Sequence, residues 1–377
     1  MSLSQPKKKR MIILIVIGCV VLLAVGINFL LTMAPIPLQF RVKEVLSQST
    51  NVVYVDNGEE FPFLYKADSE GGYSGENLKI LTFTDTHLET KLTSYSKNTL
   101  TIEMLKKNIE TEKPDLIVFT GDIVTGIFTT NRLKGLADML EAYGVYWAPV
   151  FGNHDGEFAT SRSREEICEI WGEYEHCLLK KGDVDGYGNY IINIKTSATT
   201  VSQSLVFMDS GSYMSKSDKE KYGVSGTSYD YIKQSQIDWY KQSMSTIKAR
   251  YGDTKSMLFI HIPLVEYEDA YEDGELLYGE KKEPICASEY NSGMFDAILE
   301  AGSTQAIFCG HDHVNDYDCL YQGVHFVYLQ KSGYASYDLY TKKMVVSESL
   351  RRQGTNVITI LSDGSFTNEP KLNTRFQ

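Results

Sequence analysis

The sequence has no excess of basic residues. Its 377 residues include 37 Lys and Arg against 49 Asp and Glu, which gives a formal net charge of −12. A nucleic-acid scaffold protein carries a basic patch or stripe that neutralises phosphates. The charge balance therefore argues against a nucleic-acid scaffold. It does not exclude a small anionic substrate, because bound metal ions reverse the local field inside a pocket.

The sequence also has few cysteines, and no two of them form a C-x-x-C motif, so a thiolate zinc site is unsupported. One of the six, Cys19, lies in an apolar run, and the remaining five are an odd number. An odd count leaves at least one thiol unpaired and is poor evidence for a disulfide framework. Cys168 and Cys177 are nine residues apart in a predicted helix and can pair only if the chain turns between them.

Internal repeats and low-complexity tracts are absent, and no Pro/Ser-rich linker interrupts residues 77–365. At 42% hydrophobic and 23% charged residues, the composition is that of a globular protein. The length alone predicts about two domains. Without a linker, we expect one large domain over residues 77–377, preceded by a stalk and leading strand over residues 35–76.

One long apolar run departs from this composition. Residues 11–34 contain no charged side chain, and the KKKR block at residues 7–10 precedes them. About 20 apolar residues span a bilayer as a helix, and basic residues stay on the cytoplasmic side. We therefore predict a transmembrane signal-anchor over residues 11–34, with residues 1–10 in the cytoplasm and the large domain outside it, at the cell surface or in a lumen.

Two other interpretations of this run remain open. The Thr-Met-Ala sequence that ends at Ala34 is a passable signal-peptidase site, although the apolar region of a signal peptide is usually about 7–15 residues. The sequence Val-Ile-Gly before Cys19 resembles a bacterial lipobox. Because residues 1–34 carry four positive charges and no negative ones, the rest of the chain has a net charge of −16. Such a body is repelled by an anionic membrane surface, so an anchor rather than electrostatics would hold it there.

Past this run, apolar strands alternate with amphipathic helices. Strands are predicted near residues 52–55, 78–84, 115–120, 145–151, 190–194, 205–209, 257–260 and 306–309, and helices near residues 99–112, 133–143, 231–251 and 291–301. This alternation is typical of a layered α/β fold. The Gly/Glu-rich stretch 56–76 belongs to the stalk and leading strand, and the acidic stretch 266–283 is expected to be a loop. The acidic one is either simply solvated or a lid over a site.

Polar side chains follow five of these strands, at the point where each strand ends. They are Asp85-Thr86-His87, Gly121-Asp122, Gly152-Asn153-His154-Asp155, His261 and Gly310-His311-Asp312-His313. Five of the seven histidines belong to this set, and only His176 and His325 lie elsewhere. Ligand sites of open α/β sheets collect at the carboxyl ends of strands. A single such residue is usually a cap or a turn, but five of them predict a shared site.

Carboxylate, amide and imidazole groups are the ligands that a pair of divalent cations needs. The D-x-H and H-x-H spacings place two side chains on the same side of an extended segment. Each of these pairs can therefore hold one ion.

The five blocks, complete and in order, resemble the calcineurin-like metallophosphoesterases. Residues 205–211, 236–240, 261–264 and 310–317 are further similar to the purple-acid-phosphatase-related subgroup, and the likeness covers residues 77–365. It implies a four-layer α/β/β/α sandwich with two mixed sheets. A purple acid phosphatase proper has tyrosine where this chain has Thr125. The resemblance therefore implies a colourless pair of divalent ions (Mn, Fe or Zn) rather than a purple centre.

The resemblance also implies roles for particular residues. Asp85, His87 and His313 would bind one ion, Asn153, His261 and His311 would bind the other, and Asp122 would bridge the two. A metal-bridging hydroxide would attack the phosphorus of a phosphate ester in line. His154, held by Asp155, would stabilise the pentavalent state and, if cationic, protonate the leaving group.

Four further residues are weaker candidates for substrate contacts. Asn315 and Asp316 follow the last ligand and either orient His313, line the pocket or form a plain turn. Arg351 and Arg352 can reach a phosphate oxygen, although paired arginines are usually solvated or salt-bridged.

Three other functions remain open beside a membrane-anchored phosphatase. A phosphodiesterase or nucleotidase would use the same core, and a protein phosphatase would need a peptide groove that nothing in the sequence identifies. A non-catalytic surface-binding module is the alternative from another class, but such modules typically lose ligands, and every motif position is intact here.

Overall fold

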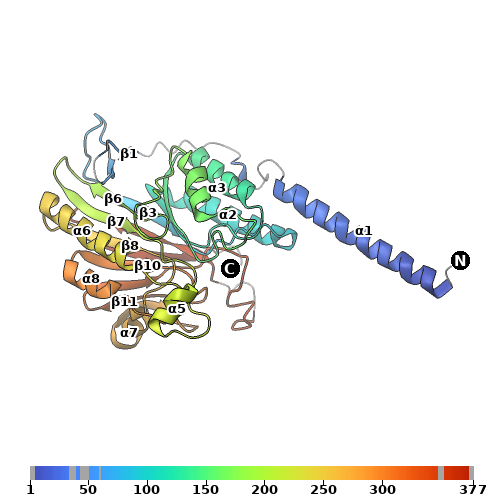
Figure 1. Cartoon of the computed structure of the whole chain (residues 1–377). Helices are drawn as coiled ribbons and strands as arrows, with labels where there is room; N and C mark the ends of the chain where they lie inside the picture. Colours follow the sequence, from blue (N-terminus) through green and yellow to red (C-terminus); the bar gives the residue numbers. More distant parts are fainter. Residues whose placement is uncertain (1–4, 34–39, 43–50, 59–60, 347–351, 373–377) are drawn as a thin grey trace.

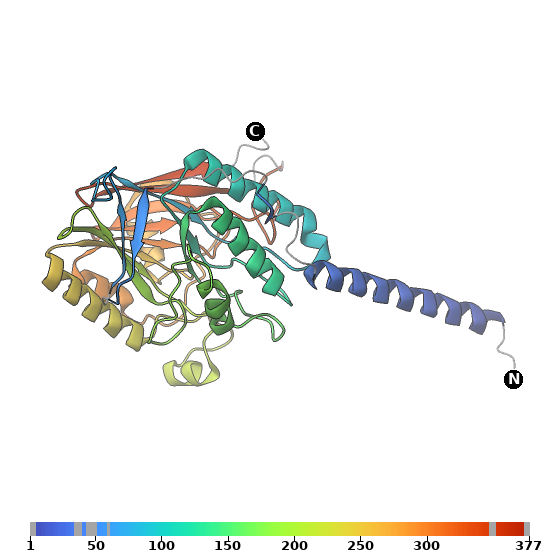
Figure 2. The same ribbon diagram turned by 90° about the horizontal axis from the view of Figure 1, so that it is seen from above.

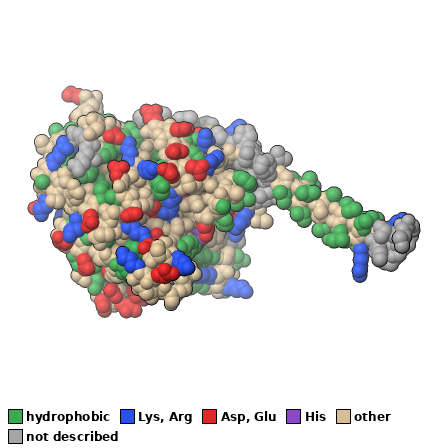
Figure 3. Space-filling view, viewed as in Figure 1, with side chains coloured by type: hydrophobic (Ala, Val, Ile, Leu, Met, Phe, Trp, Pro, Cys, Tyr) green, Lys and Arg blue, Asp and Glu red, His purple; other side chains and the backbone are tan. Residues whose placement is uncertain are grey.

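The computed structural model of the chain describes residues 5–33, 40–42, 51–58, 61–346 and 352–372 (Figure 1). Helix α1 (Gln5–Met33) projects from a compact body. Its segment Lys8–Ile27 has a mean hydropathy of 2.9 and no buried residue. Figure 3 shows mainly apolar side chains along α1, whereas acidic and basic side chains are interspersed on the visible face of the body. By length and composition α1 can cross a membrane as an anchor or serve as a signal sequence.

The smaller sheet has five strands in the order β14-β13-β3-β4-β5. Their bounds are Leu78–Phe83 (β3), Leu116–Thr120 (β4), Tyr146–Val150 (β5), Gly354–Ile360 (β13) and Phe366–Leu372 (β14). Strands β3, β4 and β5 are parallel, and β13 runs antiparallel to β3. Helices α2 (Tyr95–Glu112) and α3 (Thr130–Tyr143) connect the parallel strands. The three carboxyl ends therefore lie at one edge of the sheet.

The larger sheet has nine strands in the order β1-β2-β6-β7-β8-β10-β12-β11-β9. Their bounds are Val52–Val55, Phe63–Lys66, Tyr190–Lys195, Val201–Phe207, Lys255–Phe259, Thr304–Cys309, Val324–Tyr328, Asp316–Tyr321 and Glu275–Glu280, in the same order. The central strands β7, β8, β10 and β12 are parallel, and both sheets are thus mixed.

The two sheets share one apolar core. Phe83 and Phe119 of the small sheet belong to the same buried cluster as Phe207, Phe259 and Phe308 of the large one. A second cluster lies between the outer face of the large sheet and helices α6 (Gln234–Tyr251) and α8 (Met294–Ala301). Figures 1 and 2 show α2 and α3 on the opposite side, over the small sheet. This arrangement confirms the α/β/β/α sandwich.

Two polar stretches contain more regular structure than the sequence indicated. The stretch 56–76, to which no separate element was assigned, contains β2, which joins β1 to the large sheet through β6. The acidic stretch 266–283 is a helix, α7 (Glu266–Asp273), followed by the edge strand β9. Both stretches are polar in composition but contain buried residues, including Phe63 and Tyr267. Helix α4 (Arg164–Gly172) ends before Cys177, and Cys168 and Cys177 are both free thiols.

Candidate metal centre

The five polar motifs meet where the two sheets face each other. Each follows a parallel strand: β3, β4 and β5 of the small sheet, and β8 and β10 of the large one. The carboxyl ends of these strands therefore supply all seven predicted metal ligands from two directions. His176 and His325 lie outside this group, paired with Glu141 (2.8 Å) and Asp318 (2.9 Å) respectively.

Four buried ligands form the first group, Asp85, His87, Asp122 and His313. One ligand atom from each lies within 4.8 Å of the others. The two imidazole Nε2 atoms of His87 and His313 are 3.1 Å apart. His313 Nε2 lies 3.3 Å from Asp85 Oδ1, and His87 Nε2 lies 3.5 Å from Asp122 Oδ2.

The second group lies on the other side of Asp122. His261 Nε2 is 3.1 Å from Asn153 Oδ1 and 3.3 Å from His311 Nδ1. It is also 3.5 Å from Asp122 Oδ2. The same carboxylate oxygen of Asp122 thus faces both groups.

The atoms in these groups fit metal ions better than they fit one another. Two imidazole nitrogens 3.1 Å apart match the separation of about 3–3.5 Å expected for two ligands that each lie about 2.0–2.1 Å from one ion. Asp85 Oδ1 is buried without a hydrogen-bond partner, which is costly for a carboxylate oxygen. Its other oxygen, Oδ2, accepts hydrogen bonds from Thr84 Oγ1 (2.7 Å) and His311 N (3.0 Å). Oδ1 is therefore the atom left for an ion.

The protonation states also suit metal ligands. Burial lowers the pKa of His87 well below its ordinary value, and burial together with the charge on His261 lowers that of His311 to about 3. Burial raises the pKa of Asp122, but the charge on His261 and its hydrogen bond to the carboxylate outweigh burial and hold the pKa well below the ordinary value. Neutral imidazole and ionised carboxylate are the forms that bind metals.

The pKa of His261 indicates that the site favours a positive charge. Burial opposes its protonation, yet the carboxylates of Asp122 and Asp85 raise its pKa to about 9. In the absence of an ion, an imidazolium thus balances two buried carboxylates. A divalent cation would supply that charge instead and leave His261 Nε2 available as a ligand.

Backbone carbonyls fix the orientation of two histidines. His261 Nδ1 lies 2.8 Å from the carbonyl oxygen of Thr120, and His313 Nδ1 lies 3.0 Å from that of Tyr337. If each Nδ1 donates its hydrogen there, Nε2 is left as an acceptor that faces the site. The Tyr337 ring also stacks on His313 with centroids 4.1 Å apart.

The backbone around the ligands is strained. The φ values of four of these residues are positive: 50° for Asp85, 41° for His87, 51° for Asp122 and 80° for His311. Residues other than glycine rarely adopt such backbone conformations. Such conformations cluster at functional sites, where the surrounding structure holds them in place. Gly152 allows the close approach of two motifs, because a Cβ there would collide with the backbone nitrogen and carboxylate of Asp122.

His154 lies at the rim of the site, and its partner is not the expected one. Its Nδ1 is 2.6 Å from Glu157 Oε2. Asp155 instead accepts hydrogen bonds from the backbone N–H groups of Ile123, Val124 and Gly152. The prediction that Asp155 holds His154 was wrong, because the buried Asp155 carboxylate satisfies the amides of the neighbouring loop.

The expected substrate contacts lie elsewhere. Asn315 Oδ1 accepts hydrogen bonds from the backbone N–H groups of Lys282 and Glu283. Asp316 pairs with Arg352 at 2.7 Å. Asn315 thus holds the segment after β9, and Asp316 and Arg352 hold each other. The structure therefore does not support the predicted contact of these three side chains with a substrate, or of Asn315 and Asp316 with His313. Arg351 lies outside the described residues.

Arg164 is an important residue that the sequence analysis missed. Its guanidinium donates two hydrogen bonds to the Asp209 carboxylate (2.6 and 2.8 Å) and one to the carbonyl of Gly152 (2.7 Å). Its Nε lies 3.3 Å from the carbonyl oxygen of Asp155. Arg164 therefore fixes both ends of the loop that carries Asn153 and His154. Only the capping-box pattern that begins at Ser163 marked this position as the start of a helix.

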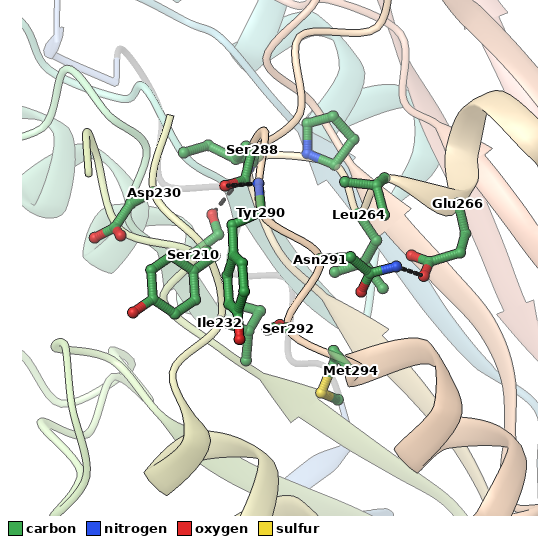
Figure 4. Close-up of a pocket in the computed structure, with 14 residues that line it drawn as sticks. Ser210, Asp230, Ile232, Leu264, Glu266, Ser288, Tyr290, Asn291, Ser292 and Met294 are labelled. Atoms are coloured by element: carbon green, nitrogen blue, oxygen red, sulfur yellow. Dashed lines mark hydrogen bonds between the residues drawn. The ribbon is translucent and has the colours of Figure 1, made fainter. Parts of the chain in front are cut away.

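A hollow of about 160 Å³ opens beside the first ligand group. Its lining includes His87, His154, Glu157, Lys91 and Phe158. A second pocket, shown in Figure 4, is lined in part by the segment that follows His261, with Leu264 and Glu266 among its residues. It offers about 20 Å³, which is space for about one water molecule rather than a phosphate ester. The hollow is therefore the approach to the metal centre.

Residues 78–315 match the family model of the calcineurin-like phosphoesterases. The chain belongs to this family. The matched segment contains all seven predicted ligands and the hollow's lining residues His154, Glu157 and Phe158, and it ends at Asn315.

Two curated relatives show how far the likeness extends within the phosphoesterase family. "Probable inactive purple acid phosphatase 14" of Arabidopsis thaliana is 29% identical over 267 residues, which are 64% of each chain. "Phosphatase DCR2" of Saccharomyces cerevisiae is 36% identical over 231 residues, 56% of this chain and 38% of the yeast protein. The chain thus spans just under two thirds of the length of the plant relative.

Among solved structures, a dimetal phosphatase from Danio rerio superimposes with a TM-score of 0.51 at 13% identity. The match covers 79% of this chain and 96% of that protein. At this identity the similarity establishes the fold alone.

Proposed function

We propose that this protein is a metal-dependent phosphoesterase that hydrolyses phosphate esters at a dinuclear centre. The observation that carries the proposal is the position of Asp122, whose Oδ2 lies 3.5 Å from the Nε2 atoms of both His87 and His261. In this assignment Asp85, His87 and His313 bind one divalent ion, Asn153, His261 and His311 bind the other, and Asp122 bridges them.

The two ions, when bound, would clamp the phosphate and activate a water molecule for attack on phosphorus. The protein's own residues position these parts. Thr125, which is buried and lines the hollow, has no phenol to give an iron(III) charge-transfer colour, so the proposed ions are a colourless pair of manganese, zinc or iron(II).

His154 is the proposed proton donor to the leaving group. Its ring centroid is 5.6 Å from that of His87, and Glu157 occupies its Nδ1. Nε2 is then the ring nitrogen available to a phosphate ester in the hollow. Burial opposes protonation of His154, but in the metal-free site the charges on Asp122 and Glu157 outweigh it and raise the pKa. When ions neutralise Asp122, Glu157 remains to favour the cationic imidazole, which is the form that can donate a proton.

We further infer that α1 anchors the protein in a membrane. The uncharged segment after residues 7–10 and the exposure of residues 8–27 support this inference. The positive-inside rule would leave the N-terminus in the cytoplasm and the metal centre on the other side.

The test measures metal content and turnover of the full chain in detergent. We expect about two metal ions per chain and hydrolysis of 4-nitrophenyl phosphate, and both should be lost together in Asp122→Asn. The matched control is His176→Asn, because His176 pairs with Glu141 away from the centre. Bis(4-nitrophenyl) phosphate separates a diesterase from a monoesterase. A wild-type protein that binds metal but turns over neither ester would contradict the proposal and favour a non-catalytic module.

A further inference from the structure

Exposed apolar side chains lie on the loops around the proposed active site. Ile127 and Phe128 are each 40% exposed, Phe158 is 44% exposed and Tyr213 is 40% exposed. The loops that carry Phe128 and Phe158 are tied together, because Phe128 N donates a hydrogen bond to the carbonyl of Thr160 at 3.0 Å. We name Ile127, Phe128, Phe158 and Tyr213 the apolar rim.

The rim is continuous with the metal centre. Phe158 lines the same hollow as His87 and His154. Near the second ligand group, the Tyr213 ring stacks on Tyr229 with centroids 5.4 Å apart, and Tyr229 meets the His311 ring edge-on at 4.4 Å. Apolar surface therefore adjoins both ligand groups.

The backbone of one rim loop is held in an uncommon conformation. Phe128 has a φ of 52° and Gly126 one of 107°, and a left-handed conformation is a genuine outlier for a bulky residue such as phenylalanine. Gly126 approaches Thr90 so closely that a Cβ there would collide with its hydroxyl. Strain of this kind persists where the surrounding structure imposes it. The loop is therefore fixed in a conformation that leaves its apolar side chains partly exposed.

The charges of the hollow indicate which part of a substrate it accepts. Among the described residues that line it, Lys91 is the single lysine or arginine, and it lies 3.7 Å from Glu89. Glu157 adds a second carboxylate. The proposed cationic His154 is likewise paired with Glu157, so a second phosphate group would compete with a carboxylate for each of these cations. An uncharged group would not compete with the carboxylates.

We propose that the apolar rim is a subsite for the alcohol portion of a phosphate monoester, and that this portion is an uncharged alkyl or aryl group. The proposal rests on the proposed phosphoesterase function. It assigns Phe158 and Tyr213 a role in specificity, since they would contact the part of the substrate that leaves.

The test compares methyl, butyl and hexyl phosphate as substrates of the full chain reconstituted in phosphatidylcholine vesicles. Their leaving alcohols have nearly the same acidity, so differences in turnover report contact with the alkyl chain. Each buried methylene contributes to binding, and we expect kcat/KM to rise at least about tenfold from methyl to hexyl phosphate. Phe158→Ser and Ile127→Ser should reduce this rise severalfold.

Leu276→Ser is the matched control. Leu276 is 47% exposed on the edge strand β9 and does not line the hollow, so its replacement should leave the dependence on chain length unchanged. Equal kcat/KM for the three esters, or a rise that survives both rim substitutions, would overturn the subsite. If neither these esters nor 4-nitrophenyl phosphate is hydrolysed, the proposed function fails, and the subsite that rests on it fails too.

Discussion

The pair of His154 and Glu157 shows how single residues set the chemistry of the rim. The family resemblance implied that His154 lies beside the substrate and that the adjacent Asp155 is its partner. The sequence alone could not decide between two nearby carboxylates. The choice depends on three backbone N–H groups that Asp155 must satisfy, and Glu157 is then the group that reaches Nδ1, at 2.6 Å.

This geometry makes Glu157 a positioning residue for the proposed proton donor. In Glu157→Ala we expect turnover of methyl phosphate to fall about 10- to 100-fold, because its alkoxide needs a proton as it leaves. Turnover of 4-nitrophenyl phosphate should fall much less, since 4-nitrophenolate leaves without one. Glu157→Gln, which keeps an acceptor oxygen, should recover part of the loss. The measurement is kcat for both esters.

The chain offers a second histidine–glutamate pair as a control. His176 Nδ1 lies 2.8 Å from Glu141 Oε2, away from the centre. Glu141→Ala should leave the ratio of the two kcat values unchanged. An equal fall on both esters in Glu157→Ala would show that Glu157 acts only through the local fold.

At the scale of elements, the sequence predicted the catalytic strands better than it predicted their surroundings. β3, β4, β5, β8 and β10 are short apolar runs followed by metal-binding side chains, and both signals are local. The pairing of β2 with β6 and of β9 with β11 is not local. β9 is an edge strand, and β2 lies next to the edge strand β1. Both are partly polar because one side faces solvent, so their composition resembles that of a loop.

The contact between two strand-end loops could not be predicted from either loop alone. Taken alone, the glycine of Gly152-Asn153-His154-Asp155 indicates only a turn, whereas in the structure it allows close packing against Asp122. The role of Arg164 could not be predicted from its own segment either, because its partners Asp209 and Gly152 come from other segments.

Gly152→Ala tests this contact between loops. The new methyl group would displace the Asp122 carboxylate, so we expect loss of most of the bound metal, with the far-ultraviolet circular dichroism spectrum retained. Gly172→Ala is the control, because a Cβ at Gly172 meets no atom within 4 Å. Full metal content in Gly152→Ala would mean that the loops separate without cost and that the close approach is not required.

At the scale of the whole molecule, the candidate metal centre brings the charge of buried carboxylates to the place where the apolar core joins the two sheets. The net charge of −12 excluded little about the substrate. It averages over the whole chain and does not show that the buried carboxylates of Asp85 and Asp122 favour cations at one site. The sequence motifs predicted which side chains gather at this candidate centre. They could not show that these side chains come from two sheets that share the core of Phe119, Phe259 and Phe308.

Because the candidate ligands follow strands of both sheets, we predict that bound metal stabilises the whole fold. A ligand that binds only the folded state adds about 2.7 kcal/mol when its concentration is 100 times Kd. We therefore expect chelation to lower the Tm of the wild-type protein by roughly 5–10 °C, at about 2–4 °C per kcal/mol. Differential scanning calorimetry with and without a chelator measures the change. Asp122→Asn removes the shared ligand, so its Tm should respond little to chelator or to added manganese. A wild-type Tm indifferent to chelator would show that the strand ends hold their positions without ions, and that the cationic His261 already balances Asp85 and Asp122.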